Sequence, residues 1–121
     1  MVDVLGFLAK QLEEIGIPYE FGEWTSEVTY PYFVGSFSEI EQRFEDAYTG
    51  GTFTVDGWMR DSKLPLIEAS DKIKERFRDL RAVTGDTALF AAFQNSSFIP
   101  TGEEDLFRIT INIETKEWKG E

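Results

Sequence analysis

The sequence predicts an α+β fold: a two-layer sandwich in which two helices pack on one face of a mainly antiparallel sheet. Residues 106–114 alternate between apolar and polar side chains, which is typical of a strand with one buried face. Residues 2–15 and 61–80 repeat apolar residues at helical spacing. The remaining apolar stretches form runs of strands that do not alternate with helices, as in α+β domains.

Length and composition indicate one domain spanning residues 1–121. The chain is 41% hydrophobic and 15% aromatic, enough to build one core but too short for two. No apolar run approaches the roughly 20 residues of a membrane span. The acidic Asp3 near the start is unlike the basic region of a signal peptide. We therefore expect neither a membrane span nor a secretion signal, and a cytoplasmic location by default.

The chain contains no cysteine and no histidine. Without cysteine there are no disulfides, no thiolate zinc sites and no Cys nucleophile. Without histidine the usual general base of serine hydrolases and the commonest transition-metal ligand are missing. These absences exclude more enzyme mechanisms than any other feature of the sequence. No cofactor is expected.

The formal net charge is −11. Such a chain repels phosphate backbones, so specific nucleic-acid binding is not expected. The acid excess is explained either by solubility or by a surface that must not adhere to another polyanion.

The first helix is predicted over residues 2–15, where apolar residues recur three or four positions apart. Gly16 fits the position after its C-cap, and Pro18 prevents the helix from resuming. Gly6, inside the helix, suggests a close packing contact. A short strand is predicted at 19–21, followed by a loop.

An aromatic strand is predicted at 32–37, and the next segment, 38–51, has two interpretations. Ser38 and Glu41 fit a capping box that would begin a short helix. Gly50 and Gly51 instead fit the turn of a hairpin whose second arm is 52–59, and we favour the hairpin.

The second helix is predicted to begin at Asp61 or Ser62, with Pro65 in its first turn, and to end near Leu80. A turn is predicted at 83–86. By pattern alone residues 87–94 could be a strand or a helix, and we favour a strand because the segment is short and follows a turn. A loop is predicted at 98–105. The strand at 106–114 follows, and residues 115–118 could prolong it.

Carboxylates are the only catalytic groups present in quantity. Two facing acids about 5 to 10 Å apart would suit glycoside hydrolysis, but solvation is the commoner role of clustered acids. The loop at 103–105 also lacks the ligand ladder of an EF-hand, so calcium binding is not favoured. The clusters considered are Glu39, Glu41, Glu45 and Asp46, and Glu103, Glu104 and Asp105.

Several large aromatic residues lie outside the alternating core pattern. Trp24, Tyr30 and Tyr32 surround a polar loop, and Tyr48 lies beside the expected hairpin turn. Such residues are favoured in protein–protein contacts, although they could equally cap the ends of the core.

The layout of the chain resembles the tail terminator (tail completion) proteins of long-tailed bacteriophages and prophages, and it is also similar to their sibling head–tail joining proteins. The resemblance rests on stretches spread over most of the chain. These are a helix ending in Gly16, Ile17, Pro18 and Tyr19, a strand led by Pro31 to Val34, the 52–58 strand, Ser62 before the second helix, and 98–102 before the final strand.

This resemblance implies a virion assembly protein without catalytic or metal-binding residues. It implies a homo-oligomer ring, typically hexameric, at the end of the tail tube, which stops tail growth and joins the tail to the head connector. The partners would be further copies of the chain, the tail tube protein and the connector. The location would be the virion, and the host cytoplasm during assembly.

Two other functions remain open: a small acidic inhibitor-like module acting on a basic partner, and a carboxylate-based hydrolase. The hypothesis we favour is the ring protein, which acts through surfaces alone. Its expected interface residues are Trp24, Glu27, Tyr30, Tyr48, Phe98, Glu103, Glu104 and Asp105.

Overall fold

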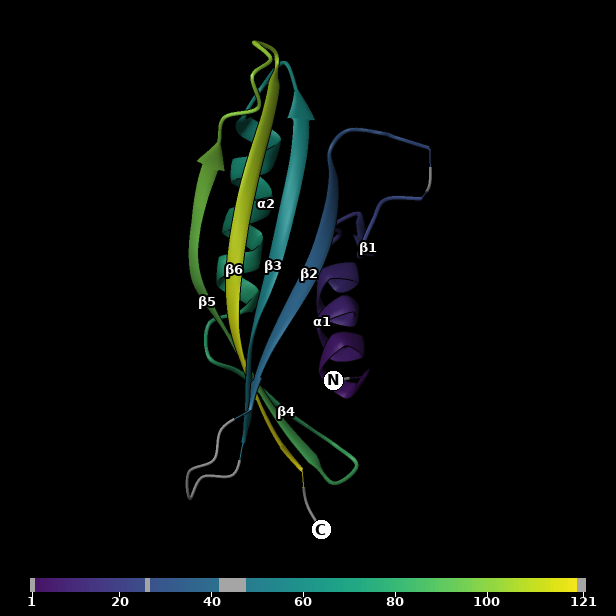
Figure 1. The fold of residues 1–121 in the computed structure, drawn as a ribbon, viewed down its shortest axis with the longest axis vertical. Helices are drawn as coiled ribbons and strands as arrows, with labels where there is room; N and C mark the ends of the chain where they lie inside the picture. Colours follow the sequence, from purple (N-terminus) through teal and green to yellow (C-terminus); the bar gives the residue numbers. More distant parts are fainter. Residues whose placement is uncertain (1, 26, 42–47, 120–121) are drawn as a thin grey trace.

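Two helices cover one face of a curled six-stranded sheet, as the sequence predicts (Figure 1). The computed structural model describes residues 2–25, 27–41 and 48–119. The helices are α1 (Val2–Glu14) and α2 (Leu64–Arg76). The strands are β1 (Tyr19–Phe21), β2 (Tyr32–Glu41), β3 (Thr49–Arg60), β4 (Leu80–Thr84), β5 (Thr87–Ile99) and β6 (Leu106–Lys119).

The strand order is β1-β2-β3-β6-β5-β4. β1 pairs with β2 in parallel, and the other neighbours are antiparallel. β6 is the longest strand and lies at the centre, because both β3 and β5 pair along nearly its whole length. The alternating stretch that predicts this strand therefore corresponds to the middle of the sheet.

The core lies between the helices and the sheet. The apolar row of β6 is buried, and side chains of the opposite parity are half-buried or exposed, as predicted. From the helices, Leu8 and Leu12 of α1 and Leu66 and Ile73 of α2 are fully buried. The buried apolar residues are Val4, Leu8, Leu12, Ile17, Phe33, Phe53, Val55, Leu66, Ala69, Ile73, Phe77, Leu89, Ala91, Ile109, Ile111 and Ile113.

α1 ends as its sequence predicts. Gly16 has φ 78°, and its N–H donates to Glu13 O. The N–H of Ile17 donates to Leu12 O at 2.9 Å, which completes a Schellman motif. The close packing contact expected at Gly6 is wrong, because that glycine is exposed and a Cβ there would have no neighbour within 4 Å.

Residues 32–41 and 49–60 form the predicted hairpin, with pairs from Tyr32 and Trp58 to Glu41 and Thr49. The alternative helix beginning at Ser38 is wrong, because long cross-strand pairing outweighs a local capping pattern. Gly50 and Gly51, expected at the turn, lie inside β3 instead. Residues 42–47, between the two strands, lie outside the described residues.

The second helix is shorter than predicted. It ends at Arg76, and the predicted end, Leu80, begins β4. Phe77 closes the helix by donating to Ile73 O, and its own carbonyl accepts from Phe93 N at 2.8 Å. This bond to β5, together with the positive φ of Asp79 (51°), redirects the chain into the sheet.

The end of the sheet also differs from the prediction. Val83 and Thr84, assigned to a turn, belong to β4, and only Gly85 and Asp86 separate the two strands. The loop predicted at 98–105 is shorter, because β5 continues to Ile99. The polar residues after Gln94 remain in β5 because β6 pairs with them beyond a register shift.

Candidate interaction surface

The sheet face opposite the helices collects the aromatic residues that carry a polar atom. All three Trp of the chain and three of its four Tyr contact one another or basic residues there. The helix-side face is built mainly from Phe and aliphatic side chains. We call the sheet face opposite the helices the open face.

The upper cluster of the open face is a chain of four rings. Tyr32 lies at its centre, with the Trp24 ring centroid 5.2 Å away and the Tyr30 centroid 5.6 Å away. Tyr32 also stacks on its cross-strand partner Trp58, with centroids 5.1 Å apart and planes 14° from parallel. Trp24 is held over the strand because its Nε1 donates to Glu27 O at 3.4 Å.

Two arginines extend this cluster toward β6 and the loop before it. Arg108 lies 5.3 Å from the Trp58 centroid, and its Nη2 is 3.3 Å from Asp56 Oδ2. Arg60 lies 5.5 Å from the Tyr30 centroid, and its Nη1 is 3.3 Å from both Glu103 and Asp105. Cations over ring faces contribute about 0.5–2 kcal/mol each, depending on desolvation.

The Asp56–Arg108 pair is incompletely satisfied within the described residues. Asp56 Oδ1 and Arg108 Nε are both shielded from solvent and have no hydrogen-bond partner in that part of the chain. Shielded groups of this kind usually find a partner in a complex or in ordered water. The two side chains as wholes remain partly exposed on the open face.

Burial and neighbouring charges both act on the tyrosines. Burial, and secondarily the neighbouring Tyr30, raise the pKa of Tyr32, while Arg60 opposes the shift. Tyr32 therefore stays neutral at physiological pH and can donate a hydrogen bond through its hydroxyl.

The lower cluster lies at the other end of the open face. Tyr48 contacts Trp118, with centroids 5.6 Å apart, and Lys116 Nζ lies 5.1 Å from the Tyr48 centroid. Arg81 covers Phe90 at 5.3 Å. Arg81, Phe90 and Trp118 line a groove of about 460 Å³ between β4, β5 and the end of β6.

A polar row separates the two clusters. Thr54 Oγ1 donates to Asn112 Oδ1, and Asn112 Nδ2 donates to Asn95 Oδ1, both at 2.8 Å. These bonds cross β3, β6 and β5 and fix the register of the central strands. The open face thus has a polar centre between two aromatic and basic ends.

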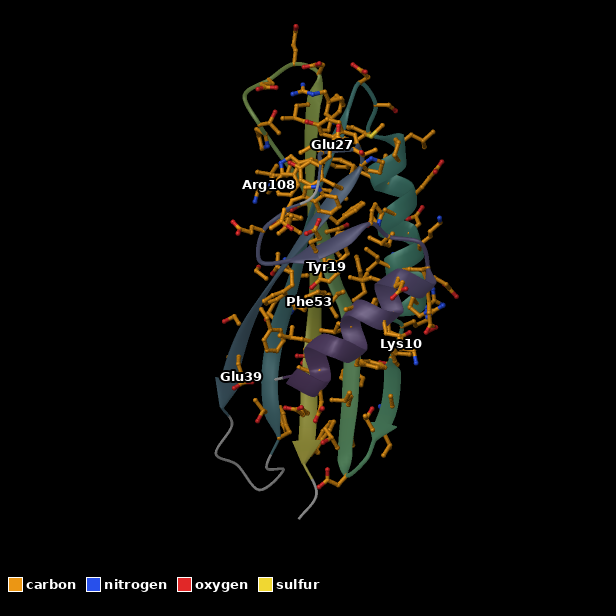
Figure 2. All side chains as sticks on the ribbon, turned by 90° about the vertical axis from the view of Figure 1, so that its right-hand side faces the viewer. Lys10, Tyr19, Glu27, Glu39, Phe53 and Arg108 are labelled. Carbon is orange, nitrogen blue, oxygen red and sulfur yellow. The ribbon has the colours of Figure 1, made fainter. Side chains whose placement is uncertain are left out.

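The structure divides the predicted interface residues among three places. Trp24, Glu27 and Tyr30 lie in or beside the upper cluster. Glu103 and Asp105 lie next to this cluster, because both contact Arg60. Figure 2 labels Glu27 and Arg108 at this end of the molecule. Tyr48 belongs to the lower cluster, and Glu104 is exposed in the 100–105 loop.

Phe98 is not part of the open face. It pairs with Ile109, whose side chain is buried on the helix side, and Lys63 Nζ lies 5.1 Å from its ring. Phe98 lines one groove together with Glu103 and Glu104.

Sequence reasoning missed Trp58, Arg60, Arg108, Lys116 and Trp118 as members of the surface. The signal was present, because each has the parity of the polar residues on its strand. A Trp on the wet side of an alternating strand is an indication of a contact surface.

The acidic clusters do not form a metal site in the structure. Within the described ranges, no three acidic side chains converge closely enough to hold a metal ion. Glu45 and Asp46 lie outside those ranges. Neither helix among the described residues is long and apolar enough to cross a membrane.

Comparisons with known proteins give a fold but no family. No protein-family profile matches the chain, and no curated protein sequence matches it. The fold is similar to that of a solved structure whose title states no function. The TM-score is 0.73 at 14% sequence identity, covering 98% of this chain and 95% of the other.

Proposed function

We propose that this chain is a phage or prophage virion assembly protein that forms a ring at the end of the tail tube. In this role it terminates tail growth and joins the tail to the head connector. The protein acts through its surfaces and catalyses no reaction.

The observation that carries this proposal is the composition of the open face. Trp, Tyr and Arg are the residues most enriched among those that dominate protein–protein binding energy. Here all three Trp lie on one side of the sheet, with Arg60 and Arg108 against their cluster. An isolated domain gains little from placing these side chains on its wet face, whereas a subunit of an assembly gains an interface.

Two further features support the proposal. The order of helices and strands follows the layout on which the resemblance to tail terminator proteins rests. The acid excess, repeated around a ring, would give a lumen that repels DNA, so the genome could pass without adhering.

Assembly and tube binding test this function. We expect size-exclusion chromatography with light scattering to find a concentration-dependent oligomer, and purified tail tubes to bind the protein at their ends. Trp58→Ala, which removes the ring stacked on Tyr32, is expected to weaken tube binding or assembly by about tenfold or more.

The control is Phe21→Ala, which removes an exposed aromatic side chain that belongs to neither cluster. A strict monomer that does not bind tail tubes would contradict the proposal. Salt-sensitive capture of a basic protein by that monomer would favour the inhibitor-like alternative.

A further inference from the structure

The sheet ends at β1 and β4, and β2 extends beyond the three-residue β1. In the described part of the chain, the longer edges without a partner strand are therefore those of β2 and β4. β1 pairs with β2 only at residues 33–35, so the edge of β2 is open from Ser36 to Glu41. β4 pairs with β5 on one side and ends the sheet on the other. Ala82 and Thr84 of β4 line a groove of about 470 Å³ together with residues of α1.

Both open edges carry exposed apolar side chains. Val83 on β4 is 76% exposed, the highest value among the exposed large apolar residues, and Ile40 on β2 is 55% exposed. Folded proteins commonly protect such edges with lysine, proline or a bulge, because an unprotected apolar edge recruits another strand. Between Ser36 and Ile40, and between Leu80 and Thr84, neither lysine nor proline occurs, and the only charged residues are Glu39 and Arg81, which have opposite signs.

The two edges lie at the same level of the sheet. Ile40 pairs with Gly50, Gly50 with Lys116, Lys116 with Phe90, and Phe90 with Arg81. One straight row of residues therefore connects the open edge of β2 to that of β4. Figure 1 shows both strands reaching the lower end of the molecule, away from the loop at residues 22–31.

The direction of β2 and β4 is also compatible with a ring of identical copies of the chain. Four successive antiparallel pairings separate β2 from β4, so the two strands run the same way. A copy related by a rotation of moderate angle about an axis along the strands keeps that direction. The β4 edge of one copy would then lie parallel to the β2 edge of the next, with little shift along the strands. Head-to-tail contacts without such a shift close into rings, and those with a shift form helical filaments.

The charges of the two sides are complementary. Residues 19–41, which lead up to and include β2, carry five acids and no bases: Glu20, Glu23, Glu27, Glu39 and Glu41. Residues 72–81, which lead from α2 into β4, carry five bases and two acids, although the whole chain has net charge −11. In Figure 2, β2 with Glu39 lies on the left of the molecule and α2 on the right. Opposite charges on the two sides favour contact between unlike sides and disfavour contact between like sides.

We infer that the β4 edge of one copy of this chain pairs with the β2 edge of the next copy, which joins the sheets of neighbouring subunits into one continuous sheet. This inference rests on the proposed ring and specifies the surfaces that close it. Ile40 and Val83 have the same parity as the open face, so they would lie on one side of the joined sheet and bury each other's apolar surface.

Engineered cysteines test the pairing directly, because the natural chain has none. The first double variant combines Ile40→Cys with Val83→Cys, and the second combines Ile40→Cys with Arg81→Cys, which covers two registers. Under mild oxidation we expect at least one to give a ladder of covalent oligomers on a non-reducing gel. Two single variants, Ile40→Cys and Val83→Cys, should cross-link when mixed but not separately.

The matched control pairs Ile40→Cys with Leu64→Cys, which is also an exposed apolar position but lies on α2. It should give no ladder. A second measurement uses Val83→Lys, a charged edge residue, which should lower the affinity of assembly by about tenfold or more without changing the folded circular dichroism spectrum. Leu64→Lys should leave assembly unchanged.

The outcomes separate the two proposals. If the wild-type protein assembles but neither double variant gives a ladder and Val83→Lys has no effect, the edge pairing is wrong and the ring proposal stands. If Val83→Cys alone gave covalent dimers, the contact would be a two-fold dimer between two β4 edges, and the head-to-tail contact would be wrong. A wild-type protein that assembles neither alone nor on tail tubes would overturn both.

Discussion

Three glycines inside strands show how single residues shape this sheet. A Cβ on Gly35 would collide with the ring of Tyr19, and one on Gly57 would collide with the ring of Phe33. A Cβ on Gly51 would likewise collide with the ring of Phe37. Each glycine therefore gives an aromatic ring of the helix-side face room to lie flat against the backbone.

Gly35→Ala is expected to destabilise the fold. The added methyl group would push on Tyr19, which also contacts Phe53 at a centroid distance of 5.7 Å (Figure 2). Overpacking of this kind costs typically about 1–3 kcal/mol of unfolding free energy. Chemical denaturation would measure the change.

Gly6→Ala is the matched control, because its new methyl group meets nothing within 4 Å and alanine is the better helix former. It should stabilise the protein by up to about 1 kcal/mol. Equal effects of the two substitutions would contradict the packing described for Gly35.

Tyr19 also makes stability depend on alkaline pH. Burial raises its pKa to about 12 in the folded chain, against 10.0 for the unperturbed side chain. Below pH 10 the phenol is neutral in both states and has no effect on the pH dependence. Between pH 10 and 12 only the unfolded state ionises, so stability falls as the pH rises.

Tyr19→Phe should therefore lose less stability than the wild type between pH 10 and 12, as measured by denaturation at a series of pH values. Tyr32, whose pKa is also raised, contributes in the same direction, so Tyr19→Phe combined with Tyr32→Phe should flatten the profile further. An unchanged slope in both variants would show that the burial of these phenols does not govern alkaline unfolding.

At the scale of elements, the orientation of α2 is set by its one buried face. Leu66, Ala69, Ser70 and Ile73 are buried, and Ser70 Oγ lies 3.3 Å from Ser96 Oγ on β5. The opposite side carries Glu68, Asp71 and Lys72 in solvent. The spacing of apolar residues predicts this orientation correctly.

Two isoleucines of α2 allow a matched comparison. Ile73 is completely buried and Ile67 is 42% exposed. Ile73→Ala should cost roughly 2–5 kcal/mol of unfolding free energy, because it leaves a cavity between the helix and the sheet. Ile67→Ala, with the same change in side chain and the same helix propensity term, should cost much less. Similar losses from both variants in urea denaturation would contradict the assigned face of α2.

Elements were predictable where the local pattern and the tertiary contacts agree. α1 follows from helical spacing and from Gly16 at its end, and the strands β3 and β6 follow from two-residue alternation. The expected turn at Gly50 and Gly51 was wrong, because both lie inside β3. β4 was missed because Leu80 continues the helical spacing of α2, while its strand geometry depends on pairing with Ala91. The available signal was the two-residue turn at Gly85 and Asp86, which joins β4 and β5 in a hairpin.

For the whole molecule, the surface was only partly predictable. Trp24 and Tyr30 were identified because they fall in an irregular loop, where a large aromatic residue is conspicuous. Trp58 and Arg108 join them through the pairing of β2, β3 and β6, whereas Trp118 contacts Tyr48 in the lower cluster; sequence alone does not reveal either arrangement. The division of the surface into two clusters is likewise a property of the folded sheet.

The common direction of β2 and β4 has a consequence for any closed assembly built through their edges. Such an assembly would have two unlike rims: the loops at 22–31 and 100–105 would face one way, and the turn at Gly85 and Asp86 the other. One rim could then dock on the tube while the other receives the connector. Identical subunits would thus make an adaptor between two different partners, with no need for a second kind of chain.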